Sequence, residues 1–119
     1  MIHQLACFNS NKGSFVDKIL SKITKTNSEQ KPSAEEKAYF ESNSLVKLGK
    51  EKRELGDFSG AIADYDKAIK INPKNGDAYV SRGFAKFYIS DRDGACKDWK
   101  KGEELGDEYG LQLLEDFCR

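Results

Sequence analysis

The side chains that most often do chemistry are few in this sequence of 119 residues. It holds one histidine, His3, three cysteines and 20 acidic residues. A nucleophile needs a neighbouring base, and the sequence contains no Ser/His/Asp or Cys/His set, no glycine-rich phosphate loop and no H-E-x-x-H segment. The cysteines are too widely spaced for the paired Cys-x-x-Cys ligands of a structural zinc site. The sequence therefore predicts a protein that is not an enzyme and has no catalytic residue, metal site or cofactor.

Aspartates in the second half of the chain are the remaining candidates for binding a cation. The turn at 90–94 reads S-D-R-D-G. Its acids lack the twelve-residue ligand spacing of a calcium loop. We interpret these aspartates as solvated helix faces and turn acids; they are Asp64, Asp66, Asp91, Asp93 and Asp98.

Charge and hydropathy exclude further classes. The formal net charge is zero, which argues against a nucleic-acid binder that works through a general basic field. Residues 1–32 carry five lysines and two acidic residues, a net charge of +3, so the rest of the chain carries −3. No apolar run approaches the roughly 20 residues that cross a bilayer, and the start lacks the basic and apolar regions of a secretory signal. The compartment is unknown from the sequence, with the cytoplasm slightly favoured.

A repeat of fixed period organises residues 42–109. Residues 60–73 read GAIADYDKAIKINP, and residues 94–107, 34 positions later, read GACKDWKKGEELGD. Both copies keep glycine, alanine, aspartate and lysine at matched places, and a tryptophan replaces the tyrosine. Apolar residues three and four apart predict two amphipathic helices in each unit.

Turn residues mark the ends of these helices. Gly56 suits a left-handed helix end, and Asp57 suits the start of the next helix. Pro73 blocks continuation of the second helix. Asp107 stands in its place in the second copy, after Gly106, and is suited to cap the N-terminus of a further helix.

This pattern resembles the tetratricopeptide repeat family, whose unit is a helix-turn-helix of 34 residues. The family's motif is met in repeats 42–75 and 76–109 by Leu45, Leu48, Gly49, Ala61, Tyr65 and Pro73, and by Tyr79, Gly83, Ala95 and Trp99. The sequence departs from it at Lys52 and Lys86, at Arg82 and at Asp107. The resemblance implies an all-α, right-handed helical repeat of helix-turn-helix hairpins that serves as a protein-binding adaptor or scaffold.

Helices are also expected on both sides of the repeats. Residues 1–32 would form an N-terminal extension with an amphipathic helix at 15–23, and residues 33–119 the repeat domain. The run S-A-E-E at 33–36 is a capping box that predicts a helix from Ala34 into the first repeat. A helix at 107–118 would cap the last repeat, with Gly102 allowing its close approach. The predicted apolar face of this cap is Leu111, Leu114, Phe117 and Cys118.

In the family that the chain resembles, the first helix of each hairpin lines a concave surface that holds a peptide or partner protein. The corresponding positions are Asn43, Val46, Lys50 and Arg53, and Asp77, Val80, Phe84 and Phe87. Phe84 and Phe87 make the second set more apolar than is expected for a surface that only faces water. Either a partner binds them, or segment 15–23 of the same chain covers them. Some family members bind chaperone tails with lysine and asparagine at particular first-helix positions. The residues at those positions here do not fit that set; they are Val46, Lys50 and Ser81. Binding of a chaperone tail is therefore not predicted.

Segment 15–23 gives rise to an alternative function, that of a structural protein that self-associates. Its amphipathic helix would then dock on a second copy, which predicts a homodimer. The lysine-rich residues 12–25 suit an anionic membrane surface as well, but packing on protein is favoured.

Arg82 and Lys86 lie where helix contacts are usually apolar. Their long stems can cover apolar surface while their charged heads reach acids on neighbouring helices. We expect a structural role for both rather than ligand binding.

Cys96 and Cys118 are expected to lie close together. Cys96 faces into the second hairpin, and Cys118 lies on the face of the cap that packs next to it. Some tetratricopeptide repeat proteins similar to this one carry the same pair. The sequence leaves open whether the two form a disulfide, worth roughly 3 kcal/mol, or remain reduced as small core residues.

Overall fold

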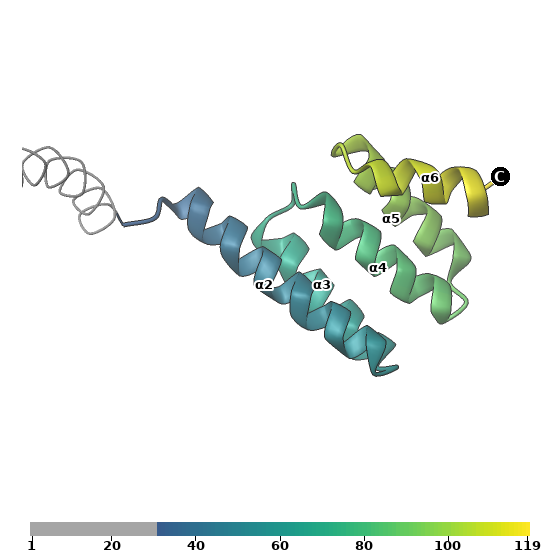
Figure 1. Cartoon of the computed structure of the whole chain (residues 1–119), viewed down its shortest axis with the longest axis horizontal. Helices are drawn as coiled ribbons and strands as arrows, with labels where there is room; N and C mark the ends of the chain where they lie inside the picture. The colour runs from purple at the N-terminus through teal and green to yellow at the C-terminus, as the bar shows by residue number, and fades with distance from the viewer. Residues whose placement is uncertain (1–30) are drawn as a thin grey trace, which may run out of the picture. The chain divides into compact units, whose positions relative to one another are not determined.

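The computed structural model describes residues 31–119, which form helices joined by short connections (Figure 1). Ala34–Arg119 is one compact unit. The prediction of an all-α repeat of helical hairpins is confirmed, and the expected helix at 15–23 lies outside the described residues. Within residues 31–119, no helix has the length and apolar character to cross a membrane. The helices are α2 (Ala34–Glu54), α3 (Phe58–Ile71), α4 (Gly76–Tyr88), α5 (Arg92–Glu104) and α6 (Glu108–Phe117).

Polar residues set the ends of these helices. Asp57, Asp91 and Asp107 cap the starts of α3, α5 and α6, and each accepts a hydrogen bond of 2.9–3.0 Å from a backbone N–H two or three residues later. Gly56 has a φ of 85°, the left-handed conformation predicted for it. Ser90 stands 34 residues later and adopts the same conformation, with a φ of 70°. The second turn therefore repeats the geometry of the first without its glycine.

Each hairpin is built on a glycine that faces an aromatic ring. Tyr65 and Trp99 are 0% and 1% exposed. A Cβ on Gly49 would lie 2.5 Å from Cε1 of Tyr65, and a Cβ on Gly83 would lie 2.5 Å from Nε1 of Trp99. The interior is close-packed, so neither position has room for a side chain. This contact explains why both repeats keep a small residue and an aromatic residue at matched places.

The hairpins stack through small residues. Ala78 and Ala85 of α4 are fully buried in one cluster with Tyr65 of the first hairpin. Leu113 of α6 is 6% exposed and belongs to a second cluster with Trp99. The first hairpin, the second hairpin and the cap thus follow one another as layers, which Figure 1 shows as α2–α3, α4–α5 and α6.

The cap α6 differs from its prediction at two positions. Leu111 is 46% exposed, and Leu113 is buried instead, because Leu113 lies on the same side of the helix as Gly110, the other buried residue of α6. Gly102 makes room for α4 and not for the cap, since a Cβ there would lie 2.5 Å from Cγ2 of Val80. The close approach of the cap occurs at Gly110, where a Cβ would lie 2.7 Å from a carbonyl oxygen of α5.

A disulfide joins Cys96 of α5 to Cys118 at the C-terminal end of α6. The two Cα atoms are 5.9 Å apart, and the cysteines are 22 positions apart in the chain. Of the two alternatives that the sequence leaves open, the structure has the bonded one. The end of the cap is therefore covalently tied to the helix that it covers.

Removal of this disulfide is expected to lower the free energy of unfolding by about 3 kcal/mol, because the unfolded chain regains the freedom that the closed loop denies it. A Cys96→Ser/Cys118→Ser variant should melt well below the wild type in circular dichroism. Cys7→Ser is the control and should melt as the wild type does. Alkylation of the unreduced protein should label neither Cys96 nor Cys118 in a mass spectrum. Three alkylated cysteines would contradict the bond.

Candidate functional site

Two aspartates predicted to be solvated are buried. Asp64 and Asp98 are 3% and 4% exposed, so that prediction is wrong for them. Lys52 Nζ lies 2.9 Å from Oδ2 of Asp64, and Lys86 Nζ lies 3.1 Å from Oδ2 of Asp98. Lys52 and Lys86 occupy the position that is usually aromatic in the repeat. A lysine–aspartate pair therefore takes the place of a ring in both hairpins, and these acids belong to the scaffold.

Arg82 joins three helices, in agreement with the structural role expected of it. Its Nε and Nη2 donate to the two carboxylate oxygens of Asp98 in α5 at 2.9 and 2.7 Å. Its Nη1 donates to Asp66 in α3 at 2.8 Å. Hydrogen bonding to Asp98 is the largest influence on the guanidinium, and it raises the pKa of Arg82 above its ordinary value. With its donors engaged in this way, the group is a fixed cation of the fold.

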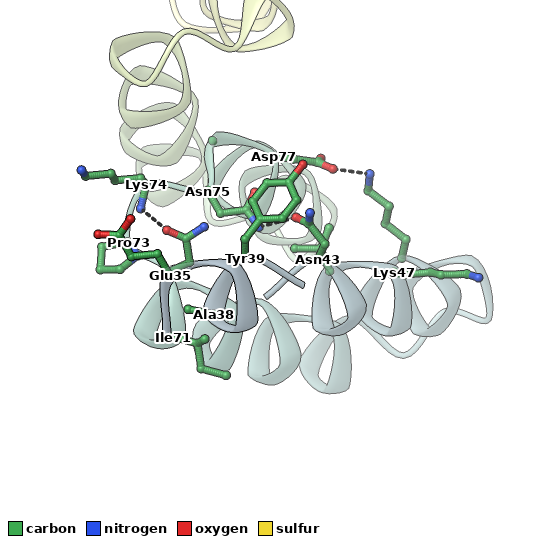
Figure 2. A pocket seen from close by; sticks show the side chains of 14 residues that line it. Glu35, Ala38, Tyr39, Asn43, Lys47, Ile71, Pro73, Lys74, Asn75 and Asp77 are labelled. Atoms are coloured by element: carbon green, nitrogen blue, oxygen red, sulfur yellow. Dashed lines mark hydrogen bonds and ion pairs between the residues drawn. The ribbon is translucent and has the colours of Figure 1, made fainter. Parts of the chain in front are cut away.

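The candidate site lies on the side of α2 that faces the connection between α3 and α4. α2 begins at Ala34, as the capping box predicts, whereas α4 begins at the equivalent of residue 42. Two extra turns of α2 therefore extend beyond the hairpin and form a wall opposite the connection (Figure 2). The open cavity between them has a volume of about 990 Å³. It is lined by Glu35, Ala38, Tyr39, Asn43, Val46, Lys47 and Lys50 of α2 and by residues 71–77.

Hydrogen bonds order the inner wall of this cavity. Asn75 caps α4 and uses its amide Nδ2 to donate to Oδ1 of Asn43 at 3.0 Å and to Oγ of Ser42 at 2.8 Å. The Ser42 hydroxyl in turn donates to the carbonyl oxygen of Ala68 at 2.8 Å. Ser42 and Asn75 are 0% and 8% exposed. The α3–α4 connection is thereby tied to α2.

Four of the eight positions predicted to contact a partner line the cavity: Asn43, Val46, Lys50 and Asp77. Lys50 Nζ and Asp77 Oδ2 form an ion pair of 2.8 Å across α2 and α4, with side chains 40% and 51% exposed. Val46 is 3% exposed, so it contributes to the floor and not to the rim. Val80 is 4% exposed and packs in the core against α5, so its assignment as an outward contact is wrong.

The other predicted contacts lie beyond the cavity, toward the cap. The Arg53 guanidinium lies over the ring of Phe84, with Cζ 5.4 Å from the ring centroid. Phe84 meets Trp99 edge-on at 5.7 Å, and Phe87 lies 5.2 Å from Phe117 of the cap. Both phenylalanines are half-buried. The cap thus covers part of Phe87. The sequence analysis offered two explanations for the exposed rings, a partner or segment 15–23, and neither included the cap. Segment 15–23 lies outside the described residues.

The cavity also contains residues that the sequence analysis missed. Tyr39, on the extra turns of α2, is 55% exposed, and Lys74 and Pro73 come from the α3–α4 connection. The capping box could have pointed to Tyr39, because it predicts a helix that starts before the repeat does. Charges of both signs surround the opening. Among residues 31–119 no group of histidine, cysteine or acidic side chains could hold a metal ion.

Comparison with known proteins agrees with the repeat of helical hairpins. Residues 49–87 match a family model of the TPR repeat. A tetratricopeptide repeat protein 36 homolog of Nematostella vectensis is 37% identical over 67 residues, which make up 56% of this chain and 37% of that protein. The chain therefore corresponds to little more than a third of that relative. Repeats of this kind generally mediate protein–protein interaction and are generally not enzymes. The family-model match falls on the stacked hairpins described above, and in this region the chain is similar to proteins of the tetratricopeptide repeat family.

Proposed function

We propose that the protein is a non-catalytic binding module that holds a peptide segment of a partner protein against α2 and the α3–α4 connection. One observation carries the proposal. Half of the positions expected on the concave surface line a single cavity of about 990 Å³. This volume lies at the upper end of the range typical of ligand sites, roughly 300–1,000 Å³.

The lining suits a peptide with mixed side chains. Ala38, Ile71 and Pro73 offer apolar surface, and the exposed ring of Tyr39 borders the opening. Aromatic side chains that keep a polar tip in water are frequent at protein interfaces. A peptide side chain that enters the cavity would therefore bury apolar area against these walls.

The Lys50–Asp77 pair offers exchangeable charges at the same place. Because both side chains are about half exposed, their mutual attraction contributes little to the stability of the fold. A partner that brings its own charges can separate the pair at little cost. The pair therefore provides one donor group and one acceptor group for the partner's backbone or side chains.

Selection from a displayed library of random peptides would test the proposal. Tyr39→Ala and Lys50→Glu should each weaken binding of a selected peptide by about tenfold or more, as expected for residues central to an interface. Lys67→Glu, an exposed lysine on α3 outside the cavity, is the matched charge control and should bind as the wild type does. Fluorescence polarisation gives the dissociation constants. If neither cavity substitution changes the dissociation constant of the selected peptides, this site is excluded.

The disulfide suggests where the module works. Such bonds form and persist in oxidising compartments and are rare in the cytosol. We infer that the protein matures in an oxidising compartment, in place of the cytoplasmic setting that the sequence slightly favours. The alkylation experiment described for Cys96 and Cys118, made on protein from its native source, tests this inference.

A further inference from the structure

One side of α2 bears an exposed stripe of residues. In α4, the counterpart of α2 in the second repeat, the equivalent residues are buried. Ser44 and Glu51 of α2 correspond, 34 residues later, to Ala78 and Ala85 of α4, which are fully buried against the first hairpin. In α2 this side is open: Leu48 is 43% exposed. It has the geometry of a stacking surface, but no helix in residues 31–119 packs on it in the way that α3 packs on α4.

The side chains of this stripe are arranged symmetrically about Ser44. Three, four and seven residues on either side of a position lie on the same side of a helix. Four residues away stand two apolar side chains, Phe40, which is 64% exposed, and Leu48. Three residues away stand Glu41 and Lys47, and seven residues away stand Lys37 and Glu51. Each apolar residue thus mirrors an apolar residue, and each charge mirrors the opposite charge.

We infer that a second copy of the chain docks on this stripe, with the two α2 helices antiparallel about a two-fold axis at Ser44. A two-fold interface brings each residue opposite its mirror position. Phe40 of one copy then meets Leu48 of the other, twice, and each Glu41 meets a Lys47. Lys37 and Glu51 form the outer pairs in the same manner. The stripe is self-complementary in both polarity and charge.

The residue on the axis permits a close approach. Ser44 is small, and its hydroxyl donates to the carbonyl oxygen of Phe40 in its own helix at 2.9 Å. No unsatisfied hydroxyl is therefore buried at the centre of the helix pair. Charge pairs around such a centre contribute specificity and orientation more than affinity.

The size of the stripe predicts a weak dimer. One helix face on each copy is at the low end of the areas found in specific interfaces, where complexes are transient. The peptide cavity stays open in this dimer, because of the stripe residues only Lys47 borders it. Self-association and peptide binding are therefore separable in experiments.

Sedimentation velocity of the full chain over a wide concentration range tests the inference. The wild type should shift from monomer to dimer as its concentration rises. Glu41→Lys and Lys47→Glu should each raise the dissociation constant by about tenfold or more, because like charges then face each other twice across the axis. The double variant Glu41→Lys/Lys47→Glu should dimerise as the wild type does. An equimolar mixture of the two single variants should form a heterodimer, because both of its facing pairs are again opposite in charge.

A second pair of variants tests the apolar contact. Leu48→Asp should abolish the dimer, whereas Leu111→Asp, at a leucine of similar exposure on the cap, should leave it intact. Unchanged circular dichroism shows that each variant is folded. A chain that is monomeric at every concentration, or charge variants that dimerise normally, would overturn the inference. A dimer lost only on removal of residues 1–32 would assign self-association to the N-terminal segment instead.

Discussion

Trp99→Ala is expected to lower the free energy of unfolding by about 3–5 kcal/mol, the range for truncating a buried aromatic residue. Trp99 is 1% exposed and fills the second hairpin above Gly83. Its ring lies within 6 Å of the rings of three neighbours, Phe84, Phe87 and Phe117, at 5.7, 5.8 and 5.9 Å. Loss of this ring leaves a cavity between α4, α5 and the cap that the neighbouring helices can fill only in part.

Urea unfolding followed by far-ultraviolet circular dichroism measures the loss. Trp99→Phe separates the ring from its hydrogen bond, because Nε1 donates to the carbonyl oxygen of Val80 at 3.2 Å. The free energy of unfolding of this variant should fall by less than that of Trp99→Ala. Tyr88→Ala, at an aromatic residue that is 62% exposed, should lose less than about 1 kcal/mol. A loss at Trp99 no greater than that at Tyr88 would show that the second hairpin is not organised around the tryptophan.

The parts of the fold that obey local rules were predictable from the sequence. The start of α2 at Ala34, the capping aspartates and the left-handed Gly56 depend on residues that are neighbours in the chain. Helix caps act over three or four residues, so a short stretch of sequence is enough to predict where a helix begins or ends. The period of 34 then carries these rules from one hairpin to the next.

Burial of the charged residues was harder to predict, because it depends on which helices meet. Asp64 and Asp98 have the sequence context of surface acids, yet α4 and α5 enclose Asp98 together with its cations. A signal was present in the repeat itself. Lys52 precedes Asp64 by the same twelve positions that separate Lys86 from Asp98. A lysine in an aromatic position with an aspartate at fixed distance indicates an internal pair.

The cavity could be predicted only in part, for a related reason. The positions on α2 and α4 followed from the family resemblance, but the opposite wall consists of residues 71–77, where α3 ends and α4 begins. That wall faces α2 only because α2 is two turns longer than α4. The partial cover of Phe87 by Phe117 depends on a contact 30 residues apart in the chain, which no local pattern reveals.

Asp98→Ala is expected to lower the free energy of unfolding by about 3 kcal/mol, because it leaves two cations without their main partner in a poorly solvated place. Both carboxylate oxygens of Asp98 are engaged, by Arg82 at 2.7 and 2.9 Å and by Lys86 at 3.1 Å. The side chains of these cations are only 19% and 23% exposed. Neither can recover full hydration without moving α4.

Asp64→Ala is the matched control for this change. Asp64 is as deeply buried as Asp98 but pairs with a single lysine, Lys52, whose side chain is 36% exposed. That ammonium group can turn to water, so the expected loss is smaller, about 1 kcal/mol. Thermal unfolding separates the two, since the loss at Asp98 corresponds to a fall in melting temperature of more than about 10 °C in a domain of this size. Equal falls for the two variants would mean that the number of cations around the carboxylate is immaterial.

A double-mutant cycle then isolates the contact between Arg82 and Asp98. Asp98→Leu takes the carboxylate from both Arg82 and Lys86, and Arg82→Met leaves Asp98 with Lys86 alone. The double variant replaces the Arg82–Asp98 pair with apolar groups, and the loss of the Lys86 contact is the same in it as in Asp98→Leu. Such a replacement is often neutral or even stabilising when the new side chains pack well. The double variant should therefore lose less than the sum of the single losses, with a coupling energy of about 1–3 kcal/mol. Additive losses would show that the contact between Arg82 and Asp98 contributes nothing to the stability of the three-helix junction.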